Sequence, residues 1–532
     1  MAYLARKPVK RAVSRTTTMA APVGGWNARD ALSAMAPEDA VTMQNWFPST
    51  SDVQLRQGRT VWCTGLGAQV ETLMDCVSPT AEAFWAVAGT TLWDVSTTGA
   101  ATAFATAPVP TLTNARWQYV NMVSSGGVYA TLAVNGTDKM IGYNGTRWNQ
   151  DGDASALYDV TGVNTANCIQ INVHKFRVWL IQSGTLDAWY LPTGAIKGAA
   201  NNFSLNGTAR SGGYLVAMAT WTVDAGYGVD DHAVFITSKG EVIVYSGTDP
   251  AAASTWQLVG VWQIGSPIGR RCFVKWAGDL LLITHDGLVP MSGALQSSRT
   301  NPKVALTDKI QFAVSTAVAD YEANFGWEIQ PFPRENMVLL NVPVAEGSNQ
   351  QQYVMNSITK SWCKFSGWDA NCFELYSDDL YQGGDGIVYR SWDGNADQYY
   401  SGGTTLGADI VGDLQQAFSY MKGPTQLKRF TLMRPVFSST VVNPPVLAGL
   451  NIDYDTSSPT SGLTGAVSAS TSDWDTSPWD TTPWAGGLNI ARFWQGATGL
   501  GYAASPHYVV STHGIDIRLM ATDIVYEIGG IL

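Results

Sequence analysis

Short strand–turn–strand units recur along this 532-residue chain, and they constrain its fold more than any other feature. Each unit has an apolar strand-like run, a tight turn of Gly, Asn, Asp or Ser, and a second such run. The six units begin near Phe84, Val128, Phe176, Val234, Cys272 and Cys372. A small meander cannot cover both of its own faces, so repeated meanders are expected to stack around an axis.

This recurrence predicts an all-β protein with a β-propeller-like core of about six antiparallel blades. The alternative is a set of unrelated hairpins in β-sandwiches. Residues 1–22 are expected to form a basic flexible arm, residues 23–402 the propeller-like domain, and residues 403–532 an additional C-terminal β-rich domain. The strands Met337 to Val342 and Gln352 to Met355 are expected to lengthen the sixth unit.

One helical segment, at about 306–323, interrupts the strands. Its apolar stripe consists of Ile310, Val314, Ala317, Val318 and Tyr321. Thr307 is the expected N-cap, and Asp308 lies in the first turn, where the helix dipole favours a carboxylate. We expect a packing helix inserted between blades rather than part of a site.

The charge of the chain is low and uneven. Charged residues make up 14% of the sequence, which also contains 53 Gly and 21 Trp, a composition that suits broad protein-facing surfaces. The first 22 residues contain five basic residues and no acidic one, which leaves 27 of the 32 basic residues against 43 acidic residues in the rest. An acidic body argues against tight nucleic-acid binding, which needs Lys and Arg to displace counterions from phosphates.

The six cysteines contain no CxxC pair and mostly lie in apolar strand-like runs, so we expect buried reduced thiols rather than a disulfide framework. No apolar run approaches the ~18 residues that span a bilayer. The N-terminus lacks the apolar core of a secretory signal. Its basic, Ser/Thr-rich composition fits either an organellar transit peptide or a docking arm.

Residues for catalysis or metal binding are sparse. The five histidines include no closely spaced pair, and we expect His174 in a strand and His285 in a turn. Asp230-Asp231 and Asp378-Asp379 are adjacent pairs, whose side chains would point to opposite faces of a strand and cannot act together as in a glycosidase. Asp151-Gly152-Asp153 lacks the remaining ligands of a calcium loop, so a solvated turn is expected. We therefore predict no enzyme, no cofactor and no metal site.

A series of short motifs runs from residue 24 almost to the C-terminus. In chain order they are Gly24-Gly25-Trp26-Asn27-Ala28-Arg29-Asp30, Met35-Ala36-Pro37-Glu38-Asp39-Ala40, Asn45-Trp46-Phe47-Pro48, Leu55-Arg56-Gln57-Gly58, Leu132 to Asp138, Tyr143-Asn144-Gly145, Gln352 to Asn356, Trp362 to Trp368, the Trp-Asp-Thr repeats at 474–484, and Asp523 to Gly530. Their order resembles phage tail tubular protein B, the tail nozzle family of short-tailed bacteriophages.

The resemblance implies a structural virion protein, made in the host cytoplasm, that forms a homo-hexameric nozzle tube below the tail adaptor ring. Tail fibres or spikes would attach nearby. The tube would retain phage DNA and then conduct it during ejection without specific binding, and an acidic lumen would repel phosphates. The family carries no catalytic residues. The candidate partner-docking residues are Arg6, Lys7, Lys10, Arg11, Arg15, Trp474, Trp479 and Trp484.

Two other functions stay open. One is a β-propeller tail protein that binds or cleaves host surface glycans, with the tryptophans at 474–484 stacking on sugars. The other is an organellar propeller whose first ~20 residues are a removed transit peptide. For the tryptophans at 474–484, packing within a core or an interface is the expected role, in preference to sugar binding.

Overall fold

The computed structural model describes residues 13–78, 82–224, 229–297, 302–441, 443–463 and 489–529. It divides into two compact units, which we describe separately. The propeller unit consists of Gly58–Met355 and Ser366–Gly407. The sandwich unit consists of the chain up to Gln57, Asn356–Phe365, and the chain from Ala408 onward. Both units are built mainly of strands, so the predicted all-β class is confirmed.

The described part of the propeller unit contains four blades, each an antiparallel sheet of four strands. The strands are, blade by blade, β6 (Arg59–Val77), β7 (Glu82–Ala88), β8 (Thr91–Asp94) and β10 (Thr102–Ala103); β11 (Gln118–Val123), β12 (Tyr129–Val134), β13 (Ile141–Tyr143) and β14 (Trp148–Gln150); β16 (Cys168–His174), β17 (Arg177–Gln182), β18 (Asp187–Tyr190) and β20 (Asn201–Ser204); β21 (Leu215–Asp224), β22 (Val229–Thr237), β23 (Glu241–Gly247) and β24 (Trp256–Gln263).

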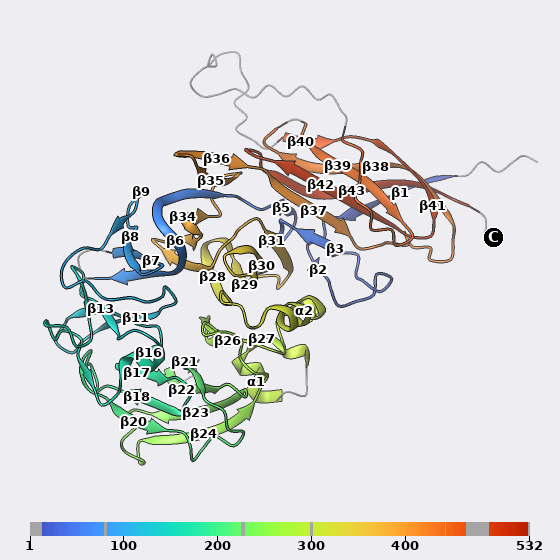
Figure 1. The fold of residues 1–532 in the computed structure, drawn as a ribbon. Coiled ribbons are helices and arrows are strands. Elements are labelled where there is room, and N and C mark those ends of the chain that lie inside the picture. The colour runs from blue at the N-terminus through green and yellow to red at the C-terminus, as the bar shows by residue number, and fades with distance from the viewer. Residues whose placement is uncertain are drawn as a thin grey trace, which may run out of the picture. The chain divides into compact units, whose positions relative to one another are not determined.

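Three smaller groups of strands complete the ring. They are β25 (Phe273–Trp276), β26 (Asp279–Thr284) and β27 (Gly287–Pro290); β28 (Glu328–Phe332), β29 (Met337–Ala345) and β30 (Ser348–Asn356); β32 (Cys372–Tyr376), β33 (Asp379–Gly383) and β34 (Asp385–Ser391). Inner strands contact one another from β6 through β11 and β16 to β21, and from β25 through β28 and β32 back to β6, while β21 contacts β26. The sheets therefore surround a common axis (Figure 1).

The predicted number of about six blades needs correction. All six predicted units form antiparallel strands, but only four of them extend into four-stranded blades. The fifth unit stops at three strands and continues into helix α1 (Met291–Ser297). The strands Met337–Ala345 and Ser348–Asn356 belong to a separate group with β28 instead of lengthening the sixth unit.

Strand β6 closes the ring because its two halves pair with different sheets. Thr64 and the residues before it pair with β34, whereas Val70–Val77 pair with β7. Gly65 and Gly67, at φ 87° and 72°, lie between these halves. Such backbone angles strain other residues, so these glycines allow the strand to turn from one sheet to the next.

The predicted helix is present, as the 3₁₀ turn Asp308–Ile310 followed by α2 (Gln311–Tyr321). Its stripe is buried at Ile310, Val314, Ala317 and Val318. Thr307 does not cap the helix with its side chain; its Oγ1 instead accepts a hydrogen bond from the Leu288 backbone N–H at 3.1 Å. The Thr307 hydroxyl therefore binds the backbone of β27 and is not available to cap the helix.

The sandwich unit packs two sheets face to face. The seven-stranded sheet contains β1 (Ser14–Ala20), β4 (Trp46–Pro48), β5 (Val53–Leu55), β38 (Lys428–Ser439), β40 (Asn489–Arg492), β41 (Gln495–Gly501) and β43 (Ile517–Ile528). Facing it are β2 (Gly25–Trp26), β3 (Asp39–Gln44), β31 (Trp362–Ser366), β37 (Ile410–Gln416), β39 (Val446–Ile452) and β42 (Ala504–Thr512). The rings of Phe437 and Tyr508, one from each sheet, meet edge to face at 5.3 Å.

The remaining short elements of the described chain connect these sheets. They are β9 (Gly99–Ala100), β15 (Val160–Thr161), β19 (Gly198–Ala199), β35 (Asp397–Ser401), β36 (Thr404–Ala408), and the 3₁₀ turns Thr165–Asn167, Pro302–Val304 and Pro333–Glu335. Among the described residues, no helix has both the length and the apolar character needed to cross a membrane.

The N-terminal region differs from the sequence-based expectation. Within the predicted flexible arm, Ser14–Ala20 form β1, antiparallel to β43, so that part of the prediction is wrong. Residues 23–57, expected in the propeller, belong to the sandwich unit, where β3 pairs with β37. In both cases the partner strand lies several hundred residues away, where local patterns do not reveal it.

All six cysteines are buried and free, as predicted. Burial raises the pKa of the Cys63 thiol to about 11, and that of Cys168 and Cys272 to about 12. These thiols are therefore protonated and act as small apolar groups in the sheets.

Candidate functional site at the propeller axis

The middle of the propeller unit contains a cavity of about 490 Å³ lined by inner strands. Its wall includes residues of β6, β11, β16, β25, β28 and β32, and we call it the inner-strand cavity. When a ring of sheets closes, the inner strand of each sheet becomes buried from solvent. Polar side chains that point inward from them must therefore find partners across the axis.

A second cavity, of about 600 Å³, lies where the turns of successive sheets converge. We call it the turn cavity. Asn135–Thr137, Ser183–Gly184, Ser238 and His285 contribute the turns that follow the second strand of four successive sheets. Arg116, Arg270 and Phe325 also line this cavity.

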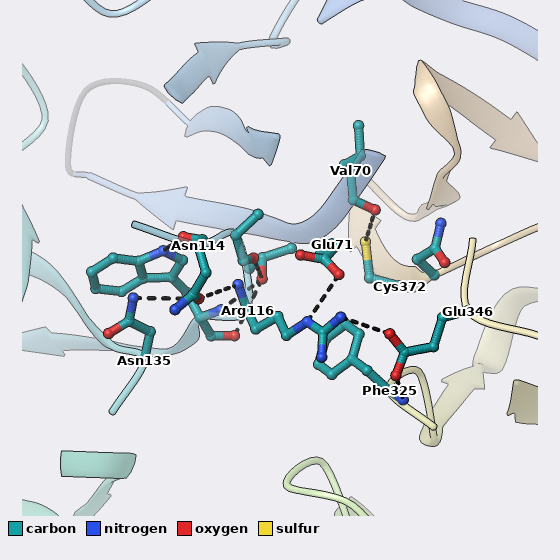
Figure 2. A network of polar contacts seen from close by, with 12 residues as sticks. Val70, Glu71, Asn114, Arg116, Asn135, Phe325, Glu346 and Cys372 are labelled. Carbon is teal, nitrogen blue, oxygen red and sulfur yellow. Dashed lines mark hydrogen bonds and ion pairs between the residues drawn. The ribbon is translucent and has the colours of Figure 1, made fainter. Parts of the chain in front are cut away.

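Arg116 forms the centre of a polar network beside this cavity (Figure 2). Its Nε lies 2.9 Å from Glu71 Oε1, and its Nη2 lies 2.8 Å from Glu346 Oε2. The guanidinium also stacks on the ring of Phe325, 4.4 Å from its centroid, while the Phe325 N–H donates to Glu346 Oε1 at 2.7 Å. Three chain segments are tied together here.

Arg271 contacts the same Phe325 ring. Its guanidinium lies 5.3 Å from the Phe325 centroid and 3.4 Å from Glu328 Oε2. Its Nη2 donates to the carbonyl of Glu71 at 2.8 Å and to Thr72 Oγ1 at 2.9 Å. Arg271 lines the inner-strand cavity and Phe325 lines the turn cavity, so this contact joins the walls of the two cavities.

The Arg271–Glu328 pair is mostly buried, with side-chain exposures of 14% and 13%. Burial opposes the charge of Arg271, but the carboxylates of Glu328, Glu374 and Glu71 outweigh it, and the net pKa is raised. Burial also raises the pKa of Glu328, against the attraction of Arg271 and a hydrogen bond from the Phe373 N–H. Such a pair is costly to separate because either partner alone would be a buried charge.

A second chain of polar contacts runs through Tyr119. Its hydroxyl donates to Glu374 Oε2 at 2.7 Å and accepts from the Asp75 backbone N–H at 3.2 Å. Burial raises the pKa of Glu374 to about 8. Burial and the neighbouring Glu82 raise the pKa of Asp75 to about 6. Burial in this part of the axis therefore favours the protonated form of Glu374.

Sequence reasoning missed these axial carboxylates. Glu328 and Glu374 come from strands 46 positions apart, so no local spacing connects them. A usable signal was present, because Glu374 is a charged residue within the otherwise apolar run Cys372-Phe373-Glu374-Leu375. An acid in a core strand indicates a buried polar partner.

The structure places the other residues singled out from sequence as follows. His174 is a buried strand residue, 3.1 Å from Thr220 Oγ1, and burial lowers its pKa to about 4. His285 lies in a turn and its Nε2 is 2.9 Å from Glu322 Oε2. Asp151 lies in the expected turn, but it is buried and accepts hydrogen bonds from the Val160 N–H and the Thr165 hydroxyl, so the prediction that it is solvated is wrong.

Of the predicted docking residues, Arg15 is exposed on β1, opposite Tyr526. Arg6, Lys7, Lys10 and Arg11 lie outside the described residues, as do Trp474, Trp479 and Trp484. Across the described ranges, no group of three or more His, Cys, Asp and Glu side chains is arranged to hold a metal ion.

Comparisons with known proteins show similarity only among solved structures. No family model matches the chain, and no curated protein matches it. Raptor of Chaetomium thermophilum is 11% identical with a TM-score of 0.34, covering 63% of this chain and 29% of that one. Sqt1 of Saccharomyces cerevisiae is 10% identical with a TM-score of 0.34, and the match covers 68% of this chain and 96% of that one. The Cps50 (Swd1) β-propeller domain of Myceliophteria thermophila is 13% identical with a TM-score of 0.35, and the match covers 64% of this chain and 99% of that one. These similarities say nothing about what this chain binds.

Proposed function

We propose that this chain is a non-enzymatic structural protein of a short-tailed phage tail, a subunit of a homo-hexameric nozzle that retains DNA and then conducts it. The sequence motifs described above support the proposal together with the exposed surface of the sandwich unit. Its partners would be further copies of itself, the tail adaptor ring, and tail fibres or spikes.

The motif residues near the N-terminus serve the framework of the sandwich unit. Asn27 Nδ2 donates to Asp30 at 2.9 Å and to Asp39 at 2.8 Å. Asn45, at φ 58°, accepts from Arg56 Nε at 2.9 Å through its side chain. These contacts tie neighbouring segments of the chain together, which suits a structural protein.

The observation that carries the proposal is the outer face of the seven-stranded sheet. Leu432, Ile490, Trp494 and Leu500 are exposed there, Leu500 by 63%. Ile490 lies opposite Ser438 on β38, and Leu500 lies opposite Arg429 on the same strand, so both extend one surface. Large exposed apolar side chains gathered on one sheet are typical of protein–protein interfaces.

The axial network bears on where DNA would pass. Arg116 and Arg271 both lie over the ring of Phe325, and these three side chains line the two cavities of a single propeller. The proposed DNA channel is the lumen enclosed by several copies rather than the axis of one propeller. An acidic lining of that lumen would keep phosphates from adhering.

The test is the assembly state of the purified full chain with its adaptor protein, measured by native mass spectrometry and electron microscopy. A six-fold ring with a central hole is expected. The double variant Leu432→Ser/Leu500→Ser is expected to lower ring formation, whereas Phe312→Ser, at an exposed apolar side chain of the propeller unit, serves as the matched control. A chain that stays monomeric with the adaptor contradicts the proposal.

A further inference from the structure

The turn cavity has one charged wall residue, Arg270, that pairs with no carboxylate of the described residues. Arg270 Nη1 donates to the backbone carbonyl of Asn135 at 2.7 Å. This contact holds one arm of the guanidinium against the Asn135–Gly136 turn, where Gly136 has φ 80° and a Cβ would lie 3.4 Å from Nη1. Among the described residues, no carboxylate pairs with Arg270.

The other charged or titratable side chains of the cavity wall have partners within the protein. Arg116 is held by Glu71 and Glu346. His285 and Glu322 pair with each other at 2.9 Å. Arg270 is exposed to solvent, and its partial burial in the wall together with the repulsion of Arg116 lowers its pKa. A guanidinium with a free planar edge matches a carboxylate in a bidentate geometry.

Hydroxyl groups and apolar surface surround this cation. Within the described chain, the side-chain hydroxyls of Ser183, Ser266 and Tyr214 make no hydrogen bond to protein, and Tyr214 is 45% exposed. Val216 and Phe325 add apolar surface to the same wall. A ring with several hydroxyl groups uses both kinds of surface, whereas a simple anion uses only the charge.

We infer that the turn cavity binds an acidic saccharide of one or two rings, with its carboxylate on Arg270 and its hydroxyls on Ser183, Ser266 and Tyr214. A cavity of about 600 Å³ lies within the size range of small-ligand sites. The inference goes beyond the proposed nozzle and is independent of ring formation. It involves binding only and no bond cleavage.

Isothermal titration calorimetry of the full chain tests the inference with glucuronate, glucose and acetate as probes. Glucuronate is expected to bind, with glucose and acetate each at least about tenfold weaker, the loss of one charge-assisted contact or of the hydroxyl contacts. Arg270→Gln is expected to weaken glucuronate binding by about tenfold or more. The control Arg492→Gln, at an exposed arginine of β40, is expected to bind as the native chain does.

Each contrary result is decisive. Absence of glucuronate binding at millimolar concentration overturns the inference. Equal binding of acetate and glucuronate reduces the site to a general anion site and overturns the saccharide assignment. Unchanged affinity in Arg270→Gln, with an unchanged melting temperature that shows the variant is folded, removes Arg270 from the site.

Discussion

Both units bury charged side chains, Arg56 and Lys428 in the sandwich unit among them, but the two units arrange polar and apolar side chains differently. The propeller unit holds Glu328, Glu374 and Arg271 on its axis, away from water. The sandwich unit fills its interior with rings such as Phe437 and Tyr508, and carries apolar side chains on an outer face. A closed ring of sheets makes its axis the site where polar groups must satisfy one another, whereas two stacked sheets leave outer faces free for other molecules.

The largest effect is expected at the propeller axis. Arg271→Leu leaves Glu328 buried without its partner, and we expect a loss of about 3–5 kcal/mol in the free energy of unfolding. Urea titration of the full chain measures it. Arg334→Leu is the control, because that side chain is 58% exposed and its ion pairs should contribute less than about 1 kcal/mol. Similar losses in the two variants would contradict a special role for the axis.

Acidity gives the next contrast. The pKa of Glu374 is about 8 when folded, so the folded state binds more protons than the unfolded one between pH ~4.5 and ~8. The penalty for ionising Glu374 is absent below this range and grows as pH rises through it. Glu374→Gln is expected to be neutral near pH 4 and to stabilise increasingly as pH rises, by on the order of 4–5 kcal/mol above pH 8. A difference that does not depend on pH would contradict this.

In the sandwich unit, ionisation of Asp523 should stabilise the fold, whereas ionisation of Glu374 destabilises it. Burial opposes its ionisation, but hydrogen bonds from Thr18 and Arg434 outweigh it and lower the pKa. This contribution is present above pH ~4 and is lost as pH falls through the lowered pKa. Asp523→Asn is expected to cost about 1 kcal/mol at pH 7 and little below pH 3. A larger cost in acid than at pH 7 would refute it.

The smallest effect on stability is expected on the outer face. Leu500→Ser removes an exposed side chain, so the free energy of unfolding should change by less than about 0.5 kcal/mol. The same variant should lower self-association, which sedimentation velocity measures. A large loss of stability with unchanged association would show that Leu500 supports the fold rather than an interface.

Local sequence patterns predicted the hairpins and the helix because their contacts are close in the chain. The pairs Val87–Leu92 and Thr131–Tyr143 follow directly from strand periodicity and Gly/Asn turns. The pairings that define the units could not be predicted this way, since Ser14 meets Glu527 and Ala40 meets Gln416. Arg271 and Glu374 remained hidden for the same reason, because an axial site exists only after distant strands close.

The shared strand β6 also sets an order of events in synthesis. Thr60 Oγ1 donates to Asp393 at 2.6 Å, and these residues are 333 positions apart. Until the later segment leaves the ribosome, the first half of β6 has an unpaired edge that could join another chain. An incomplete propeller can therefore form wrong strand pairs during synthesis. The positive-φ glycines at 65 and 67 turn the unpaired edge of β6 away from the rest of the first blade.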